Sequence, residues 1–296
     1  MAIQIRPIQT HAEYRAVEQL QREVWGLPEV DIVPDHLLLT AQKNGGLVLG
    51  AFDIPAGAEG GALVGFVFGF PGLLPDGRVK HCSHMAGVAP AYQNQNVGYQ
   101  LKLAQRDHVL AHGLDLITWT FDPLESRNAY LNFHKLGVVC RTYLRELYGH
   151  MRDGLNVSLP SDRFQVDWHI ASAHVARRLG SGPTSPAPLP EREGGEVPPT
   201  LAVLEAAGVP LVNRLLPGEP PHPPQKTLPL EGERLLIQIP SQFQAIKSAD
   251  VELALAWRLH TRDLFEAAFA TGYIATDLLF GNGQSCYLLE KEWTLA

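Results

Sequence analysis

The chain has 296 residues, of which 45% are hydrophobic, and a formal net charge of −7 at pH 7. This length suits one large globular domain or two smaller ones, and the negative charge argues against nucleic acid as a partner. No apolar run approaches the length of a membrane span, and the N-terminus lacks the apolar core of a signal peptide. The three cysteines have no metal-ligand spacing, so neither disulfides nor a metal site are indicated, and a reducing cytoplasm is favoured.

The first part of the chain predicts one strand, two helices and then three strands. Residues 2–8 alternate like a strand, and Thr10 with Glu13 forms a capping-box pattern that starts a helix. A second helix is expected from Asp35 to about Gly45. The strands that follow are expected at residues 46–52, 62–70 and 79–88.

The chain then alternates between helices and strands. A helix at 99–112 is stopped by Gly113, and a helix at 126–137 ends at its own glycine. Further strands are expected at 114–121, in VVCRTYLREL and in RFQVDWHIA. Together these elements predict an α/β fold, in which helices pack on the faces of a mixed sheet of about seven strands.

Proline divides the chain, because 13 of its 23 prolines lie between Pro183 and Pro229. Such a segment cannot be regular helix or inner strand, although its apolar piece at 200–212 can dock or form a helix. We therefore expect a main domain at 1–180, a proline-rich connector at 181–230 and a C-terminal unit at 231–296.

The C-terminal unit predicts the order strand, helix, strand, strand, with a glycine-containing turn after the helix. The same order of elements occurs at residues 114–170. The unit is therefore either a degenerate half-repeat of that segment or an ordinary αβ addition that extends the sheet.

A candidate anion site lies in HMAGVAPAYQNQNVGYQLKLAQR (84–106), which leads from a strand through a polar turn into a helix. A helix N-terminus offers N–H groups and the positive end of a dipole to an anion. The turn QNQNVG (93–98) can hold one if Gly98 lies near the start of the helix. Asn96 tolerates a left-handed backbone, and Lys102 and Arg106 add positive charge further along the helix.

The stretch VAPAYQNQNVG (88–98) resembles the acyl-CoA motif V-x-P-x-[YF]-[RQ]-x-x-G-x-[GA] of the GNAT N-acyltransferase superfamily. Asn96 stands where that motif has a glycine. A second stretch, NAYLNFHKLG (128–137), resembles the superfamily's second motif, in which Asn-Ala precedes a helix that ends in Lys-Leu-Gly. The resemblance covers about residues 1–170.

This resemblance implies a GNAT-like fold with an extra C-terminal αβ unit. Pantetheine of acetyl-CoA or another acyl-CoA would lie in a splay between the strands 79–88 and 114–121, with its pyrophosphate on the turn. The acceptor would be the amine of a small molecule or an amino-acid-like compound, which attacks the thioester directly without a metal. The implied cofactor contacts are Ala86, Val88, Gln93, Asn94, Gln95, Asn96, Val97, Gly98, Tyr99, Asn128 and Phe133.

Three side chains are candidates on the acceptor side of the reaction. His84 is the first candidate for the base because its pKa class suits neutral pH, and His81 is the alternative. Strand alternation places His84 and Cys82 on one face and His81 and Ser83 on the other. The resemblance places the acceptor site near the end of the first helix, which makes Glu23 the next candidate. Each could instead be an ordinary structural or surface group.

The superfamily often protonates the departing thiolate with a tyrosine, and Phe133 occupies that position here. Tyr130 and His134 can substitute, or the thiol leaves unassisted. Asn128 is either a cofactor contact or a helix cap.

Polar groups also follow the strand 114–121 and lie in the C-terminal helix. Asp122 and Glu125 stand where αβ sheets often place functional groups, although Asp122 can simply end the strand. Arg258 and Arg262 could receive an anionic group or form a solvated helix face. The alternative to an enzyme is a weakened GNAT-like module that senses acyl-CoA or serves as a scaffold, and the oligomeric state stays open.

Overall fold

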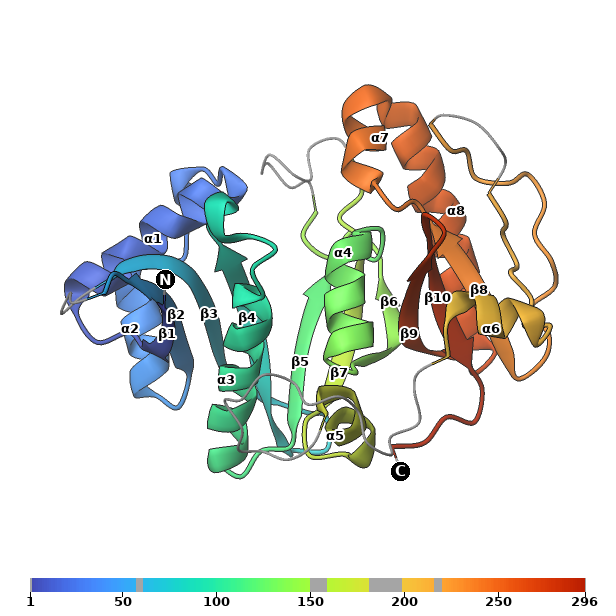
Figure 1. Ribbon diagram of the computed structural model, residues 1–296. Helices are drawn as coiled ribbons and strands as arrows, with labels where there is room; N and C mark the ends of the chain where they lie inside the picture. The colour runs from blue at the N-terminus through green and yellow to red at the C-terminus, as the bar shows by residue number, and fades with distance from the viewer. Residues whose placement is uncertain (1, 57–60, 150–158, 181–198, 216–219, 296) are drawn as a thin grey trace. The chain divides into compact units, whose positions relative to one another are not determined.

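The computed structural model forms two compact units, which divide between Trp119 and Thr120 within a strand (Figure 1). None of the helices in the described ranges is both long enough and apolar enough to cross a bilayer. The structure describes residues 2–56, 61–149, 159–180, 199–215 and 220–295.

The first unit contains a mixed sheet with the strand order β1-β2-β3-β4-β5. The first four strands pair antiparallel, and β4 pairs parallel with β5. The sheet therefore has the mixed character that the sequence predicts. Its strands are β1 (Ala2–Pro7), β2 (Leu47–Ile54), β3 (Ala62–Leu73), β4 (Val79–Val88) and the beginning of β5 (Leu116–Phe121).

The first helix begins at the predicted capping box. The Thr10 hydroxyl accepts a hydrogen bond from the Glu13 amide, and the Glu13 carboxylate accepts one from the Thr10 amide. Each side chain thus satisfies a helix-end N–H group that has no partner within the helix. The helices of this unit are α1 (His11–Trp25), η1 (Glu29–Asp31), α2 (Asp35–Lys43), η2 (Pro90–Tyr92) and α3 (Val97–Ala111).

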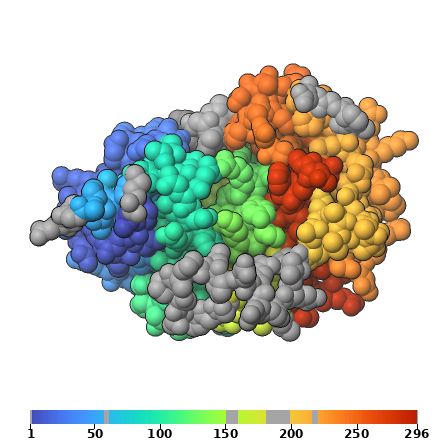
Figure 2. Space-filling model, viewed as in Figure 1, coloured from blue at the N-terminus to red at the C-terminus, as the bar shows by residue number. Residues whose placement is uncertain are grey.

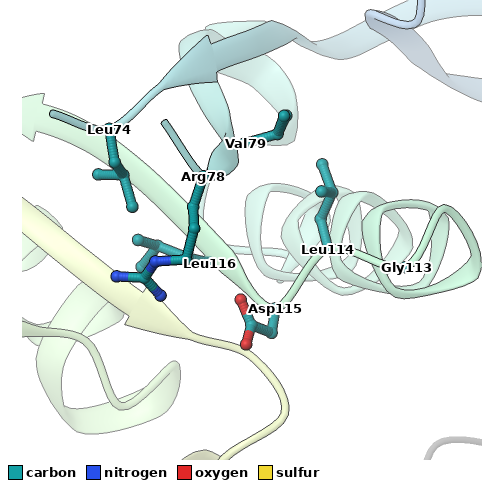
Figure 3. Close-up of a pocket in the computed structure, with 7 residues that line it drawn as sticks. All are labelled: Leu74, Arg78, Val79, Gly113, Leu114, Asp115 and Leu116. Carbon is teal, nitrogen blue, oxygen red and sulfur yellow. The ribbon is translucent and has the colours of Figure 1, made fainter. Parts of the chain in front are cut away.

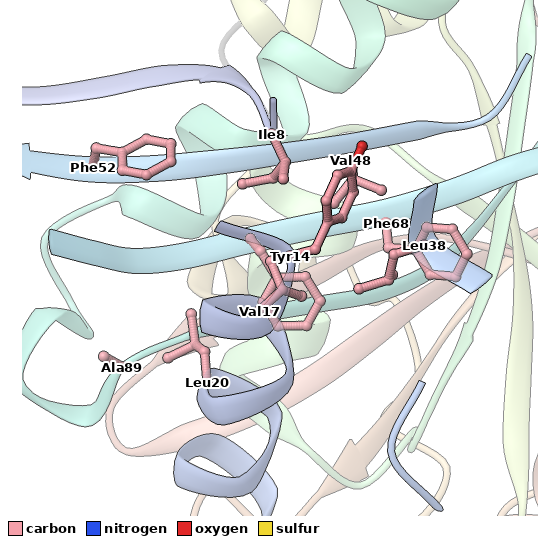
Figure 4. Close-up of a cluster of buried hydrophobic side chains, with 10 residues drawn as sticks. Ile8, Tyr14, Val17, Leu20, Leu38, Val48, Phe52, Phe68 and Ala89 are labelled. Atoms are coloured by element: carbon pink, nitrogen blue, oxygen red, sulfur yellow. The ribbon is translucent and has the colours of Figure 1, made fainter. Parts of the chain in front are cut away.

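Helices cover both faces of this sheet. Tyr14, Val17 and Leu20 of α1 and Leu38 of α2 pack on one face (Figure 4). Val97 and Leu101 of α3 belong to a second cluster on the other face. Alternate residues of β2 supply the two clusters, as expected of a strand that is buried on both sides. The strand residues facing α1 and α2 include Val48, Phe52, Phe66 and Phe68, and those facing α3 include Leu47, Leu49, Ala51 and Val67.

The second unit contains five further strands in the order β7-β6-β9-β10-β8, and the carboxyl end of β5 borders β7. The pairs β6–β7, β6–β9, β9–β10 and β10–β8 are antiparallel. The strands are β6 (Val139–Leu144), β7 (Arg163–His169), β8 (Arg234–Ile239), β9 (Ile274–Gly281) and β10 (Gln284–Glu290).

The helices of the second unit differ from the prediction in three respects. The helix predicted at 249–270 begins at Val251, where extended Asp250 caps it by accepting from the Leu253 amide, and a separate helix at Phe243–Ala249 precedes it that was not predicted. The helix expected at 126–137 continues after its first turn as a π-helix. A helix capped by Ser172 was not predicted. The helices are α4 (Ser126–Ala129), the π-helix η3 (Tyr130–Lys135), α5 (Ala173–Leu179), α6 (Leu201–Ala206), α7 (Phe243–Ala249) and α8 (Val251–Ala270).

The connector prediction is only partly within the described residues, because 181–198 and 216–219 lie outside them. Its apolar piece does form a helix, α6, which begins with a Thr200 cap. Leu201 and Leu204 pack against side chains of β8, β9 and β10. The predicted domain boundaries near residues 180 and 230 do not coincide with the division into two units at residue 119, and they stay a prediction.

The half-repeat reading is supported by the pairing within the second unit. Strands β5, β6 and β7 follow one another around a helix that ends at Gly137, and β8, β9 and β10 do so around a helix that ends at Gly272. In both sets the third strand lies between the first and the second. The two sets meet where Cys140 of β6 pairs with Ala275 of β9, and each residue lies three positions after its glycine.

The two copies share a backbone irregularity as well. The β6–β7 register skips Arg141, and the β9–β10 register skips Thr276. Each skipped residue lies four positions after the glycine that ends the preceding helix. A β-bulge at the same position in both sets of strands favours the half-repeat over an unrelated addition, because bulges are specific features of a strand.

Candidate functional site

The polar turn before α3 has the backbone that the sequence predicts. Asn96 is left-handed, with φ 60° and ψ 11°, and α3 begins at the next residue. Asn94 is also left-handed, with φ 66°. The helix has no side-chain cap at its N-terminus. Asn96 thus has the left-handed backbone that asparagine tolerates, and α3 starts two residues earlier than predicted.

The glutamines of this turn hold the turn together. The Gln93 amide donates to the Val88 carbonyl at 3.3 Å, and the Gln95 amide donates to the Ala91 carbonyl at 3.0 Å. Side-chain contact with an anion is therefore secondary here. Main-chain N–H groups of the first turn of α3 are the donors that such a turn presents.

Gly98 is not required by its backbone or by its packing. A Cβ added there would meet only Val88 Cγ2, at an ordinary 3.7 Å. Its φ is not in the left-handed range either. The missing side chain leaves the start of α3 open to close approach from outside. Figure 2 shows the α3 segment, coloured teal, on the exposed face of the molecule.

Strands β4 and β5 share a short parallel pairing near the start of the predicted cofactor edge. Within the first unit their parallel pairing is limited to His81 with Ile117 and Cys82 with Thr118. Strand β4 continues to Val88, so its edge from Ser83 onward is not paired with β5 in that unit. The predicted splay beyond these pairs stays a prediction.

A β-bulge at His84 changes which residues of β4 face each helix layer. Ser83 pairs with Gly69 and Met85 with Phe68, so that His84 is the extra residue. Before the bulge, Ser83 contacts α3. After it, Met85 packs with the α1 cluster. The bulge therefore reverses the alternation at the residue predicted to be the base.

His84 lies on the α1 side of β4, between two aromatic rings. Its ring centroid is 5.8 Å from that of Phe68 and 5.9 Å from that of Phe70. The side chain keeps exposed surface, yet burial against these rings lowers the pKa of His84. The imidazole is therefore neutral at neutral pH and can accept a proton.

His81 lies on the α3 side, as predicted, but in a closed environment. Its Nε2 lies 3.1 Å from Gln105 Nε2, and burial lowers its pKa to about 4. A Cβ on Gly69 would lie 2.3 Å from His81 Nε2, so only glycine fits there. These contacts indicate that His81 has a structural role.

Lys102 does not extend toward the anion turn as predicted. It is 6% exposed and donates to Ser83 Oγ at 2.8 Å and to Gln105 Oε1 at 3.3 Å. Its Nζ also lies 3.8 Å from the centroid of the Trp119 ring. Its charged group therefore lies on the face of β4 that α3 covers.

The end of α1 closes over β4. Trp25 packs so near Gly87 that a Cβ there would meet the indole at 2.9 Å. The same indole makes an edge contact with Phe66, at 5.9 Å between centroids. Glu23, the predicted acceptor-side carboxylate, is exposed near this end of the helix.

The predicted residues of the second unit have mostly structural partners. Asn128 is exposed and accepts from Asn132 at 3.3 Å, while Glu125 occupies the cap position of α4. Asn128 is therefore not a cap. Phe133 is fully buried, and its ring contacts Phe121 and Tyr287.

Tyr130 and His134 stack on each other, with ring centroids 4.6 Å apart. His134 Nδ1 lies 3.1 Å from Asp277 Oδ1, and Arg178 donates to the other oxygen of Asp277 at 2.8 Å. His134 thus belongs to a charged cluster. Tyr130 is half-buried and stays the candidate proton donor on this helix.

The two arginines of α8 form neither a solvated face nor an anion receptor. Arg258 makes a bidentate pair with Asp122, and Arg262 makes one with Asp162, at 2.7 and 2.9 Å. Burial alone would raise the pKa of Asp122, but the guanidinium of Arg258 holds it below its usual value. Both arginines therefore receive carboxylates of the protein itself. Glu125 accepts from Gln244, and burial raises its pKa.

A cavity of about 270 Å³ lies at the opposite end of β4 and α3 from the turn. Figure 3 shows Arg78 and Asp115 among the side chains that line it. Its position beside Val79, where β4 begins, separates it from every predicted site residue. We therefore assign it no part in the candidate site.

No family model matches the sequence. No curated protein matches it either. Solved structures that the chain resembles include the ribosomal-protein-S18-alanine N-acetyltransferase of Escherichia coli, with 16% identity over 58% of this chain and 96% of that one, at a TM-score of 0.43. The IAA acetyltransferase of Bacillus cereus has 14% identity over 56% and 98%, at a TM-score of 0.41. The NatC complex bound to Gag peptide and CoA has 13% identity over 57% and 99%, at a TM-score of 0.44.

These proteins are what the chain resembles. A family assignment therefore depends on the two motifs and on the geometry of β4, β5 and the turn before α3.

Proposed function

We propose that this protein is an acyl-CoA-dependent N-acyltransferase that acts on the amine of a small-molecule or amino-acid-like acceptor, with acetyl as the first choice of acyl group. One observation carries this proposal. The segment that resembles the GNAT motif folds as a strand whose parallel pairing in the first unit stops at Cys82, then a turn with left-handed Asn94 and Asn96, and then a helix without a side-chain cap.

In this proposal the pyrophosphate binds main-chain N–H groups at the start of α3, where Gly98 allows close approach. Pantetheine then lies along the unpaired edge of β4, from Val88 past Ala86 toward Ser83. A strand edge of this kind can pair with the two amides of pantetheine as it would with another strand.

Direct attack on the thioester requires a base for the acceptor amine. His84 is our candidate because its neutral imidazole can take that proton, and the bulge places it on the α1 side of β4. Glu23 on α1 is the candidate for binding a cationic acceptor. No covalent intermediate on the protein is needed.

A second function is an acyl-CoA sensor or scaffold without turnover. Phe133 supports it, because the phenyl ring at the family's tyrosine position is buried among aromatic rings and cannot donate a proton. Tyr130 is the only hydroxyl on this helix within the described residues, besides Ser126 at its start.

Calorimetry with CoA tests the binding site. We expect Gly98→Val to weaken binding at least a hundredfold, since its side chain occupies the approach to the N–H groups. The matched control is Gln100→Val, which puts the same residue at an exposed position of α3. Equal binding by the parent and Gly98→Val would place the pyrophosphate elsewhere.

Release of free CoA thiol tests the activity. The parent protein is mixed with acetyl-CoA and pools of amines and amino acids, and thiol release is followed with a thiol reagent. Turnover supports the enzyme, and CoA binding without turnover in any pool supports the sensor. Absence of both would leave the scaffold.

A further inference from the structure

Lys102 is a buried cation whose hydrogen-bond partners are all neutral. Its ammonium donates to Ser83 and Gln105 and lies over the Trp119 ring. Within the described ranges, no carboxylate lies within ion-pair distance of it. Buried charges are normally paired, because an unpaired one is costly to remove from water.

Lys102 lies beside the last paired residues of β4 and β5 in the first unit. The last pair of the two strands is Cys82 with Thr118, and Ser83 and Trp119 are the next residue on each strand. Lys102 contacts both of these residues. Its ammonium therefore lies at Ser83, the first position of the β4 edge that has no pair with β5 in the first unit.

The other end of this β4 edge, at Val88, leads into the anion turn. The edge of β4 from Val88 back to Ser83 is about 16 Å long, at about 3.3 Å per residue. An acyl-CoA with its pyrophosphate on the turn and its pantetheine along this edge would bring its sulfur to the Ser83 end of the edge.

We propose that Lys102 is the proton donor to the departing thiol in the acyl transfer. This inference rests on the proposed function. It also explains how the reaction proceeds although Phe133 replaces the expected tyrosine: the donor comes from α3, on the same unit as the anion turn.

The step balances as follows. The acceptor nitrogen attacks the thioester carbonyl, and His84 takes a proton from that nitrogen. The tetrahedral intermediate collapses, the C–S bond breaks, and its electron pair goes to sulfur. The Lys102 ammonium gives a proton to sulfur, so the products are the amide and the neutral thiol. Solvent then removes the proton from His84 and restores one to Lys102.

The bulge separates the two proton-transfer groups. His84 lies on the α1 side of β4 with Phe68 and Phe70, and Lys102 lies on the α3 side with Ser83. Base and acid thus reach the reaction centre from opposite faces of one strand. Such an arrangement keeps the acceptor's proton away from the donor.

Few titratable groups face Lys102. Cys82 and His81 of β4 are near it, and His108 and His112 of α3 act on His81. Burial lowers the pKa of Lys102 to about 7 and raises the pKa of Cys82. The amine can therefore exchange its proton near neutral pH, as a general acid must.

The test is Lys102→Met, which fills the same space without charge. With acetyl-CoA, we expect kcat to fall at least a hundredfold, KM for acetyl-CoA to change by less than threefold, and the pH limb near 7 to disappear. Lys80→Met, at a half-buried lysine near the start of β4, is the matched control and should retain the parent rate.

An S-aryl thioacetate supplies the second measurement, because its thiolate leaves without a proton. Parent and Lys102→Met should then react at similar rates. Equal loss with both thioesters, or an unchanged rate with acetyl-CoA, would overturn the role of Lys102. A parent that binds CoA but transfers nothing to any amine would instead overturn the proposed function.

Discussion

Buried positive side chains have different kinds of partner in the two units. In the second unit, Arg258 pairs with Asp122, Arg262 with Asp162 and Arg178 with Asp277. In the first unit, Lys102 is buried as well, and among the described residues its partners are Ser83, Gln105 and the Trp119 ring.

This difference separates structural from functional charge. A guanidinium in a bidentate pair has its charge already balanced by a carboxylate of the protein. An ammonium that is surrounded by neutral groups can still interact favourably with a negative charge that forms beside it. The number of buried charges is therefore less informative than whether each has an opposite charge beside it.

Removing one member of a buried pair should have the largest effect on stability. We expect Arg258→Met to lower the free energy of unfolding by about 3–5 kcal/mol, because Asp122 would be left buried without its main partner. Lys102→Met should be neutral or stabilising. Urea denaturation of both variants compares them.

A double variant serves as the control. Asp122→Asn combined with Arg258→Met should recover part of the lost stability, since the stranded carboxylate is gone. If Arg258→Met costs less than 1 kcal/mol, roughly the value of an exposed pair, the contrast between the units fails.

The pH dependence of stability should show a smaller effect at Lys102. Its pKa is about 7 in the folded protein, against an ordinary value of 10.5, so between these values the unfolded chain holds a proton that the folded one has lost. Raising the pH therefore stabilises the parent relative to Lys102→Met, by about 2–3 kcal/mol between pH 7 and pH 9. Denaturant melts at several pH values measure this difference. A parallel pH dependence of the two proteins would mean that Lys102 titrates near its usual value.

An exposed pair should show the smallest effect. Arg214 donates to Glu205 at 3.0 Å, but their side chains are 62% and 32% exposed. Arg214→Gln should change the free energy of unfolding by less than about 1 kcal/mol, because water screens the pair. A loss comparable to that of Arg258→Met in the same urea series would show that burial does not decide the value of a pair.

Local patterns predicted most of the elements correctly. Thr10 and Glu13 fixed the start of α1, and glycines marked the ends of helices at Gly113 and Gly137. These signals act over a few residues, so they survive without knowledge of the fold. The similar order of elements in the two segments could also be predicted, because it is a property of the chain.

Contacts between distant residues could not be predicted. Strand alternation alone predicted the face of the strand on which His84 lies. The bulge that makes His84 the extra residue depends on the register between β4 and β3, which the sequence does not show. Lys102 looked like a surface cation beside the turn, and only the packing of α3 on β4 shows that it is buried. Helical spacing placed Arg258 and Arg262 together, whereas their carboxylates come from segments at least a hundred residues away.

The junction between β6 and β9 has a further consequence. In a symmetric homodimer, a twofold axis brings equivalent residues of two subunits opposite each other. Cys140 and Ala275 meet in this way within one chain. The second unit thus contains, within one covalent chain, a strand pairing of a kind that two separate subunits could form only by association. Its formation is unimolecular, so this edge-to-edge pairing does not weaken on dilution as a dimer interface would.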